Sequence, residues 1–244
     1  MIKTIILFMY LGFSMTILIP YGLVSTLFYL LGLRKLMTQA VYRLAQGWAR
    51  VVIWIVGCKV TVSGRENIFK DGSVCFVSNH CGYFDIPLLL AYAGRPFGFV
   101  AKIELLFIPF LNCWIYMLGG LFINRSSSKS AVRTINKGVK KIKRGGGMLI
   151  FPEGHRSKGR GLLPFHPGSL KLATMAEVPI IPVAIEGTYD VFEKTGRVVS
   201  TSARIIFCEP IDTASLPPED RKHILRDRIF SVIKEKLEAS PVVQ

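Results

Sequence analysis

The stretch that decides the fold runs from Ser73 to Asp85 and reads SVCFVS at 73–78, then NHCGYFD at 79–85. The first half is an apolar run of the length of a buried strand. At the far end, Asp85-Ile86-Pro87 is typical of a helix start, with a capping residue followed by proline in the first turn. A strand that passes through a short loop into a helix is one unit of an α/β sheet.

The same alternation of short apolar runs and helical periodicity continues from Cys58 to the end of the chain. The strands that we predict are Lys59–Ser63, Ser73–Ser78, Phe97–Ala101, Gly120–Ile123, Gly147–Phe151, Ile180–Ile185 and Ala203–Cys208. The predicted helices are Ile86–Ala93, Lys102–Leu118, Lys129–Lys143, Ser169–Ala176 and Pro218–Leu237. Few of the strands alternate strictly, which indicates a sheet covered on both faces. We therefore predict an α/β fold with a mostly parallel central sheet flanked by helices.

The N-terminal part of the chain differs from this pattern, because no charged residue occurs from Thr4 to Leu33. A membrane-spanning helix needs about 20 apolar residues, so the run is long enough to cross a bilayer. Because Pro20 lies near its middle, a kinked helix or a helical hairpin embedded in one leaflet is an alternative. A pair of core helices in a soluble protein is a further alternative. The following segment, 35–56, combines apolar and basic side chains and is typical of the membrane interface. We predict a membrane-anchoring helical module at 1–57 and a catalytic domain at 58–244.

Composition narrows the class of partner. The chain has 244 residues, half of them hydrophobic, and 31 basic against 16 acidic residues give a formal charge of +15. This excess predicts an anionic partner, and the high apolar content favours an anionic phospholipid membrane over nucleic acid, for which no motif is present. A basic membrane-binding protein without catalysis stays a rival hypothesis. The basic face of Lys129–Lys143 is either a solvated surface or a docking site for anionic lipid or an acidic carrier protein. Five scattered cysteines without a CxxC pair indicate neither structural disulfides nor a zinc site.

His80 and Asp85 are candidate catalytic residues. Five residues of continuous helix would turn the two side chains about 140° apart, so they meet only if His80 lies in a loop and Asp85 in the first helical turn. The strand, the Gly82 loop and the helix start at Asp85 provide that arrangement. The carboxylate then fixes the imidazole tautomer and leaves the other nitrogen as a general base. Taken alone, Asp85 as a helix cap and His80 as an ordinary loop histidine remain alternatives.

A second polar cluster, FPEGHRS at 151–157, follows the glycine-rich strand GGGMLI at 145–150. Glu153 and Gly154 are expected just past the carboxyl end of that strand, where α/β sheets place their sites. Arg156 and its basic neighbours, together with turn amides, could form a phosphate-binding concavity. A tight surface turn with solvated charges is the alternative.

Four blocks in order resemble the glycerolipid acyltransferase family, and within it the lysophosphatidate acyltransferases of bacterial type. They are Asn79-His80-x4-Asp85, Gly120–Arg125, Phe151–Ser157 and Val178–Val183, and the stretch Ala101–Leu105 resembles the family segment between the first two. The resemblance implies that His80 is the base and Asp85 its partner. It also implies that an acceptor phosphate is held by the substrate-binding residues Lys102, Arg125, Glu153, Gly154 and Arg156. The chain departs from the family at Gly82, Asn124 and His155, where serine, aspartate and threonine are usual.

The implied reaction moves a fatty acyl group from acyl-CoA or acyl-carrier protein to the sn-2 hydroxyl of lysophosphatidate, at the cytoplasmic face of a bacterial inner membrane. The thiolate of the donor thioester is a good leaving group, so we expect no covalent enzyme intermediate. We also expect no metal and no other cofactor. A lipase is the chemical rival. No Gly-x-Ser-x-Gly occurs, and only Cys81, next to His80, could supply its nucleophile. Another lysolipid, such as lyso-ornithine lipid, is the alternative acceptor.

Overall fold

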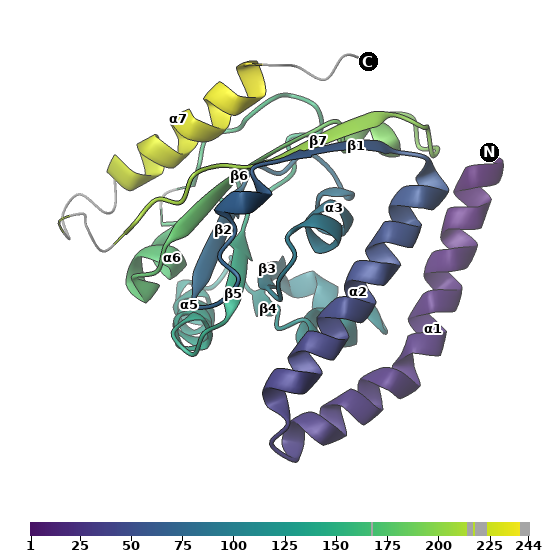
Figure 1. Ribbon diagram of the computed structural model, residues 1–244, viewed down its shortest axis with the longest axis horizontal. Helices are drawn as coiled ribbons and strands as arrows, with labels where there is room; N and C mark the ends of the chain where they lie inside the picture. Colours follow the sequence, from purple (N-terminus) through teal and green to yellow (C-terminus); the bar gives the residue numbers. More distant parts are fainter. Residues whose placement is uncertain (167, 214–216, 218–223, 240–244) are drawn as a thin grey trace.

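The computed structural model describes residues 1–166, 168–213, 217 and 224–239, and it is built around one seven-stranded sheet (Figure 1). The strands are β1 (Lys59–Ser63), β2 (Val74–Ser78), β3 (Gly98–Lys102), β4 (Leu121–Ile123), β5 (Gly147–Ile150), β6 (Ile180–Glu186) and β7 (Ser202–Phe207). Their spatial order is β1-β7-β6-β2-β5-β3-β4. Five neighbouring strands, from β6 to β4, run parallel, whereas β7 pairs antiparallel with β6 and carries β1 parallel to itself. The prediction of a mostly parallel α/β sheet is confirmed.

Burial along the strands follows their position in the sheet. Every residue of β2 and β5 is buried, because both faces of the central strands are covered by helices. The edge strand β1 and its neighbour β7 alternate between more and less buried positions. The difference explains why the central strands read as continuous apolar runs in the sequence.

Helices cover both faces of the sheet (Figure 1). They are α1 (Ile2–Leu30), α2 (Arg34–Val56), α3 (Asp85–Tyr92), α4 (Leu111–Met117), α5 (Ser128–Ile142), α6 (Lys171–Ala176) and α7 (Ile224–Glu238), with 3-10 turns η1 (Arg65–Asn67), η2 (Ile103–Phe107) and η3 (Tyr189–Val191). One core lies between the sheet and α2 and α3, and includes Phe76. A second core lies between the sheet and α5, α6 and α7, and includes Cys75 and Val77. Successive residues of β2 thus enter opposite cores, as the period of a strand requires.

One helix prediction needs correction. The single helix expected over Lys102–Leu118 is wrong, because Lys102 ends β3 and the chain then forms η2 and, after Pro109, the short helix α4. Pro109 has no N–H to donate and Phe110 has a positive φ of 65°, so a continuous helix cannot pass through them. The start expected for the last helix, at Pro218, lies outside the described residues.

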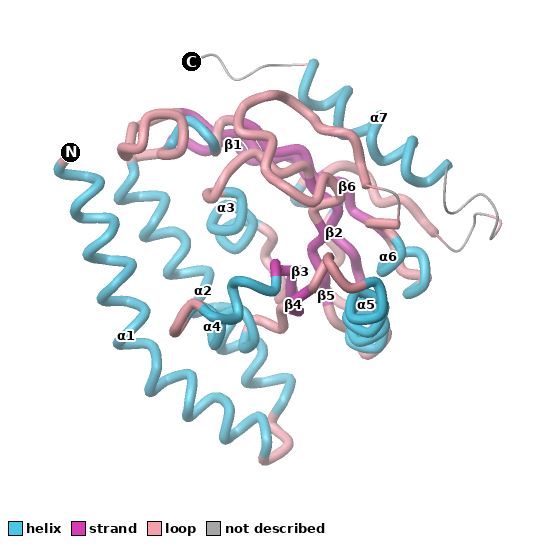
Figure 2. The backbone as a smooth tube through the Cα atoms, turned by 180° about the vertical axis from the view of Figure 1, so that it is seen from behind, coloured by secondary structure: helices cyan, strands magenta, loops and turns pink. Residues whose placement is uncertain are grey.

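The N-terminal helices form a hairpin against the catalytic part of the chain. Lys3 donates a hydrogen bond to Ser200, the Val198 N–H donates to the Thr4 hydroxyl at 2.9 Å, and Leu7 is buried beside Val52 and Val191. α2 returns along α1 and packs on α3 (Figures 1 and 2). The segment Ile2–Phe28 is long and apolar enough to cross a membrane, and most of its side chains are not covered by protein. The division into segments 1–57 and 58–244 stays a prediction.

Candidate active site

The predicted site residues meet at one edge of the sheet. His80 follows β2, Lys102 ends β3, Arg125 follows β4 and Glu153 follows β5. These four strands are mutually parallel, so their carboxyl ends lie side by side. The carboxyl edge of a parallel sheet is the usual location of a site in an α/β fold.

His80 and Asp85 form a hydrogen-bonded pair, with 2.6 Å between Nδ1 of the imidazole and Oδ2 of the carboxylate. The Asp85 side chain is fully buried, and its Oδ2 also accepts the N–H groups of Cys81 at 2.8 Å and Gly82 at 3.1 Å. The hydroxyl of Thr188 donates to the other carboxylate oxygen. The prediction of Asp85 as N-cap is wrong in detail. Phe84 occupies the cap, and Asp85 is the first helical residue with its side chain turned back to the His80 loop.

The orientation of the His80 ring leaves its second nitrogen, Nε2, without a hydrogen bond to the described residues. The imidazole stacks on the ring of Phe151, with centroids 4.0 Å apart and planes 15° from parallel. Asp85 orders the ring from one edge and Phe151 from one face, so its orientation is fixed. Within the described residues no hydrogen bond reaches Nε2, and one-fifth of the side chain is exposed. An Nε2 that accepts a proton while Asp85 holds Nδ1–H is the arrangement of a general base.

Glu153 connects the two polar clusters through the backbone. Its buried carboxylate accepts the His80 N–H at 2.9 Å and the Leu163 N–H at 3.3 Å. Burial raises the pKa of Glu153 to about 7, although the two N–H donors act in the opposite direction. The Ser157 N–H donates to the His80 carbonyl at 2.7 Å, which makes a second link between the two clusters. Glu153 therefore holds the backbone of His80 in place and joins the two polar clusters.

Arg125 and Gly154 form the neighbouring part of the site. The Arg125 guanidinium donates to the Gly154 carbonyl. Gly154 has a φ of 73°, a conformation that favours glycine, and a Cβ there would lie 2.7 Å from Cδ2 of His166, so the His166 ring would have to move. Lys102 lies at the end of the strand beside β4, with its ammonium 2.8 Å from the Glu104 carboxylate. The exposed cations Lys102 and Arg125 thus flank the same end of the β3–β4 pair.

Arg156 is engaged in a different way. Its guanidinium pairs with Glu193 and stacks 3.8 Å above the ring of Tyr83. The other Glu193 oxygen accepts the Tyr83 N–H. Arg156 therefore ties the second cluster to the loop that follows His80, and part of its charge is already compensated by Glu193.

Comparison with known proteins identifies the family. The sequence model described as Acyltransferase matches residues 59–186, which is more than half of the chain. The chain belongs to the acyltransferase family. A 1-acyl-sn-glycerol-3-phosphate acyltransferase from Borreliella burgdorferi is 34% identical over 190 residues, which are 76% of each protein. One from Salmonella typhimurium is 36% identical over 135 residues, 55% of each protein. The crystal structure of the 1-acyl-sn-glycerophosphate (LPA) acyltransferase PlsC from Thermotoga maritima superposes with a TM-score of 0.81 at 30% identity, covering 98% of this chain and 96% of that one.

Two residues that complete this site, Thr188 and Glu193, were not predicted from the sequence. Thr188 and Glu193 follow β6, whose carboxyl end lies at the same edge as those of β2 and β5. Asn79 was recognised as part of a motif, but the structure gives its function: the buried side-chain amide exchanges two hydrogen bonds of 2.8 Å with the backbone of Ile185. The position of Thr188 just past a predicted strand was the available signal for it. No sequence signal pointed to Glu193.

Cys81 does not fit the nucleophile of the rival lipase hypothesis. Its thiol donates to the Ile185 carbonyl at 3.1 Å. Burial, and then the charges of Asp85 and Glu153, raise the pKa of Cys81 well above its ordinary value. A reactive cysteine needs a lowered pKa and access to substrate, so this thiol is in the wrong environment.

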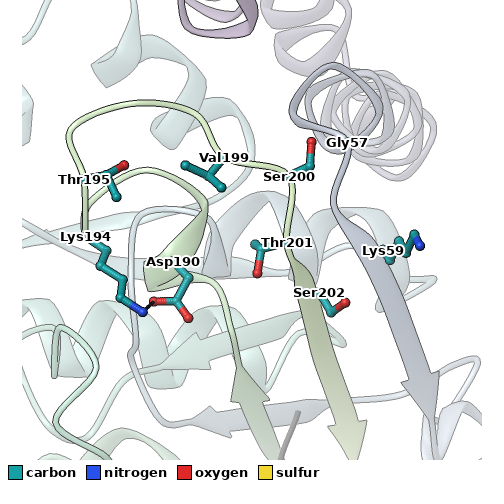
Figure 3. Close-up of a pocket in the computed structure, with 9 residues that line it drawn as sticks. All are labelled: Gly57, Lys59, Asp190, Lys194, Thr195, Val199, Ser200, Thr201 and Ser202. Carbon is teal, nitrogen blue, oxygen red and sulfur yellow. Dashed lines mark ion pairs between the residues drawn. The ribbon is translucent and has the colours of Figure 1, made fainter. Parts of the chain in front are cut away.

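A separate hollow of about 520 Å³ lies between η3 with the residues that follow it and the first residues of β1 and β7 (Figure 3). Asp190 and Lys194 form an ion pair of 3.1 Å at one side, and Ser200, Thr201 and Ser202 follow one another along the other. His80 does not line this hollow. The hollow is therefore distinct from the space at His80.

Proposed function

We propose that this acyltransferase moves a fatty acyl group from a thioester donor, acyl-CoA or acyl-carrier protein, to the sn-2 hydroxyl of 1-acylglycerol-3-phosphate, and so forms phosphatidate. The observation that carries the proposal is the His80–Asp85 pair with its unbonded Nε2. The relatives that bear the name of this activity, and the similar fold of the Thermotoga maritima enzyme, support the choice of acceptor.

The mechanism needs one general base. Nε2 of His80 takes the proton of the acceptor hydroxyl as its oxygen attacks the thioester carbonyl, and the bond from carbon to sulfur then breaks. The sulfur departs as a thiolate, which the proton on His80 neutralises. Asp85 stabilises the imidazolium between these two events. We infer no metal or other cofactor, because a thiolate leaves without assistance from a Lewis acid.

The acceptor phosphate is proposed to bind at the ends of β3, β4 and β5. Arg125 is the strongest candidate, since it is exposed and its guanidinium already lies at Gly154. Lys102 is on the adjacent strand and adds a second positive charge. Arg156 contributes through Tyr83 and the loop after His80, and Glu153 through the backbone of His80. In this proposal the site has one base, His80, and one cationic corner, formed by Lys102 and Arg125.

The enzyme is proposed to work on an anionic phospholipid membrane, at the cytoplasmic face of a bacterial inner membrane. Both ends of the α1–α2 hairpin are attached to the catalytic part of the chain, near Lys3 and near Val56. A hairpin fixed in this way favours insertion into the nearer leaflet over a complete crossing. The lysolipid acceptor resides in that leaflet, and each methylene kept out of water is worth about 0.8 kcal/mol.

The test is acyl transfer by detergent-purified protein supplied with acyl-CoA or acyl-carrier protein thioester. Lysophosphatidate, lysophosphatidylcholine and lyso-ornithine lipid are compared as acceptors, and His80→Ala is assayed beside the parent. Phosphatidate formed from lysophosphatidate and lost in His80→Ala is the expected result. Acylation of lyso-ornithine lipid in preference would replace the acceptor and keep the mechanism. Full activity of His80→Ala would refute the mechanism.

A further inference from the structure

An uncharged and unusually exposed segment interrupts the catalytic part of the chain. No charged residue occurs from Leu105 to Asn124. This stretch does not form a buried strand or a core helix over its first half, but folds as η2, the Pro109 turn and α4. Its exposed large side chains are Leu106 (40%), Phe107 (78%), Ile108 (44%), Phe110 (41%) and Tyr116 (72%). Soluble surfaces rarely gather so many apolar side chains within eleven residues, so the segment is expected to contact another apolar body.

The segment lies directly against the N-terminal helix. α4 contacts α1, and the two run close together in Figure 2. Gly22 of α1 is one point of close approach, since a Cβ there would lie 2.8 Å from Sδ of Met117. On either side of Gly22, α1 exposes Ile17, Leu23 and Val24. The apolar surface of α1 and that of the η2–α4 segment are therefore neighbours in space although about 80 residues separate them in sequence.

The backbone of the segment also carries strain. Phe110 has a φ of 65°, a left-handed conformation that costs a residue with a Cβ about 1 kcal/mol or more. The turn that contains Phe110 separates η2 from α4 and leaves Phe107 and Ile108 exposed. We expect the cost of this strained turn to be offset by burial of its apolar side chains against a body outside the protein.

We propose that the η2–α4 segment, Leu106–Tyr116, is a second membrane-inserting surface that enters the same leaflet as α1. The proposal rests on the membrane attachment argued above. Lipid is favoured over a protein partner because the segment continues the apolar surface of α1 and because cations flank it. Lys102 precedes the segment, Arg125 follows it, and both lie at the carboxyl edge of the sheet.

The consequence is a fixed orientation of the active site. With the hairpin as the single membrane contact, the whole molecule would be free to tilt on the membrane, whereas a second contact at the β3–β4 end removes that freedom. The apolar segment then sits in the acyl region while Lys102 and Arg125 remain at the level of the lipid phosphates, as snorkelling cations do. The acceptor would therefore reach the cationic corner with its acyl chain still in the leaflet.

Cys113 provides a direct probe, because it is the exposed member of the five free cysteines and lies in α4. The full chain is labelled there with an environment-sensitive NBD dye and reconstituted into vesicles of phosphatidylethanolamine and phosphatidylglycerol. The control carries Cys113→Ser with Ile224→Cys, since Ile224 is half exposed on α7, far from α1 (Figure 1). We expect a blue shift and strong quenching by nitroxide-labelled acyl chains at residue 113, and several-fold weaker quenching at residue 224. Equal and weak quenching at both positions, in protein shown by flotation to be vesicle-bound, overturns the proposal.

Two other outcomes are informative. Dye at residue 113 that is shielded from water but not quenched by lipid, together with cross-linking between copies, would assign the segment to self-association and overturn the lipid proposal. Failure of the protein to float with vesicles would instead contradict the proposed membrane attachment on which the inference rests. Acyl transfer in detergent micelles reports on the proposed reaction separately from both.

A substitution tests the functional consequence. Phe107→Asp places a charge on the most exposed side chain of the segment, and Ile224→Asp is the matched control. We expect Phe107→Asp to lower the rate on vesicle-borne lysophosphatidate about tenfold, because burial of an aromatic side chain is lost, and to leave the rate in micelles at the parent level. Equal rates of the two variants on vesicles would argue against the segment as an orienting contact.

Discussion

Asp85→Asn is the sharpest test of the catalytic pair, because the substitution removes a charge and leaves the shape unchanged. Oδ2 of Asp85 receives three N–H donors, from the His80 ring and from the backbone of Cys81 and Gly82. In the variant the amide oxygen must take this position, since an NH2 group there would face the same donors. The amide nitrogen then faces Thr188, whose hydroxyl can turn to accept. The buried polar groups remain paired, so the fold should be retained.

The magnitude follows from the separation of the charges. Nδ1 and Oδ2 are 2.6 Å apart, and the centres of the imidazolium and carboxylate charges are about 4 Å apart, so their attraction is about 4 kcal/mol at an effective dielectric constant of about 20. The neutral amide keeps a hydrogen bond of about 1 kcal/mol. The transition state, in which His80 becomes cationic, thus loses about 3 kcal/mol, which lowers kcat about 150-fold.

The assay measures kcat and KM for lysophosphatidate with acyl-CoA as donor, together with thermal unfolding of each variant. Asp227→Asn, which removes the carboxylate of an exposed ion pair on α7, is the control for a change of one charge. We expect a loss in kcat, an almost unchanged KM and an unfolding temperature close to that of the parent. A kcat within threefold of the parent, in folded protein, would refute the view that Asp85 stabilises a cationic His80.

Three further outcomes are expected. Cys81→Ala should retain most of the parent kcat, because the thiol is buried and its pKa is raised; loss of turnover with the fold intact would restore the thiol mechanism. Arg125→Ala should raise the KM for lysophosphatidate at least tenfold, because a charge-assisted hydrogen bond to the phosphate is lost, and should leave the KM for a neutral monoacylglycerol unchanged. Equal effects on the KM of both acceptors would exclude a contact between Arg125 and the phosphate. Burial raises the pKa of Glu153 from 4.5 to about 7, so the folded state binds this proton more tightly than the unfolded chain. The contribution of this proton to the free energy of unfolding is therefore complete below pH 4.5 and falls by about 3 kcal/mol as the pH rises through 7. The plot of unfolding temperature against pH should accordingly be flatter for Glu153→Gln than for the parent.

Much of the fold was predictable because its signals are local. Apolar runs of strand length gave all seven strands to within two residues at either end, and α5 appeared as a stripe at helical spacing. That stripe packs inward at Ile142, while Val132 at its other end is half exposed. Lys141 lies within the predicted basic helix Lys129–Lys143, yet its ammonium turns to the Gly119 carbonyl at 2.7 Å, and burial lowers its pKa. A long flexible side chain can leave the face that periodicity assigns to it.

The contacts that complete the site were not predictable from local patterns. Phe151 reads as the end of a strand, and only the packing of β5 beside β2 places its ring against His80. Thr188 reaches Asp85 across 103 residues of sequence, and Glu193 reaches Arg156 across 37. Each of these pairs depends on the order of the strands in space, which the spacing of motifs along the chain does not specify.

The departure from the family at Gly82 acquires a physical reason from the same contacts. A Cβ at Gly82 would lie 2.6 Å from the Glu193 carboxylate and 3.0 Å from Cα of Tyr189, so the residues after β6 occupy the space that a serine side chain would need. The same carboxylate holds the Tyr83 N–H and pairs with Arg156. Gly82 and Glu193 are thus linked, because the absent side chain makes room for the acid that neutralises Arg156. Because Arg156 is already paired with Glu193, we propose that Arg125 and Lys102 are the main ligands of the acceptor phosphate, and these two cations also border the proposed second membrane contact.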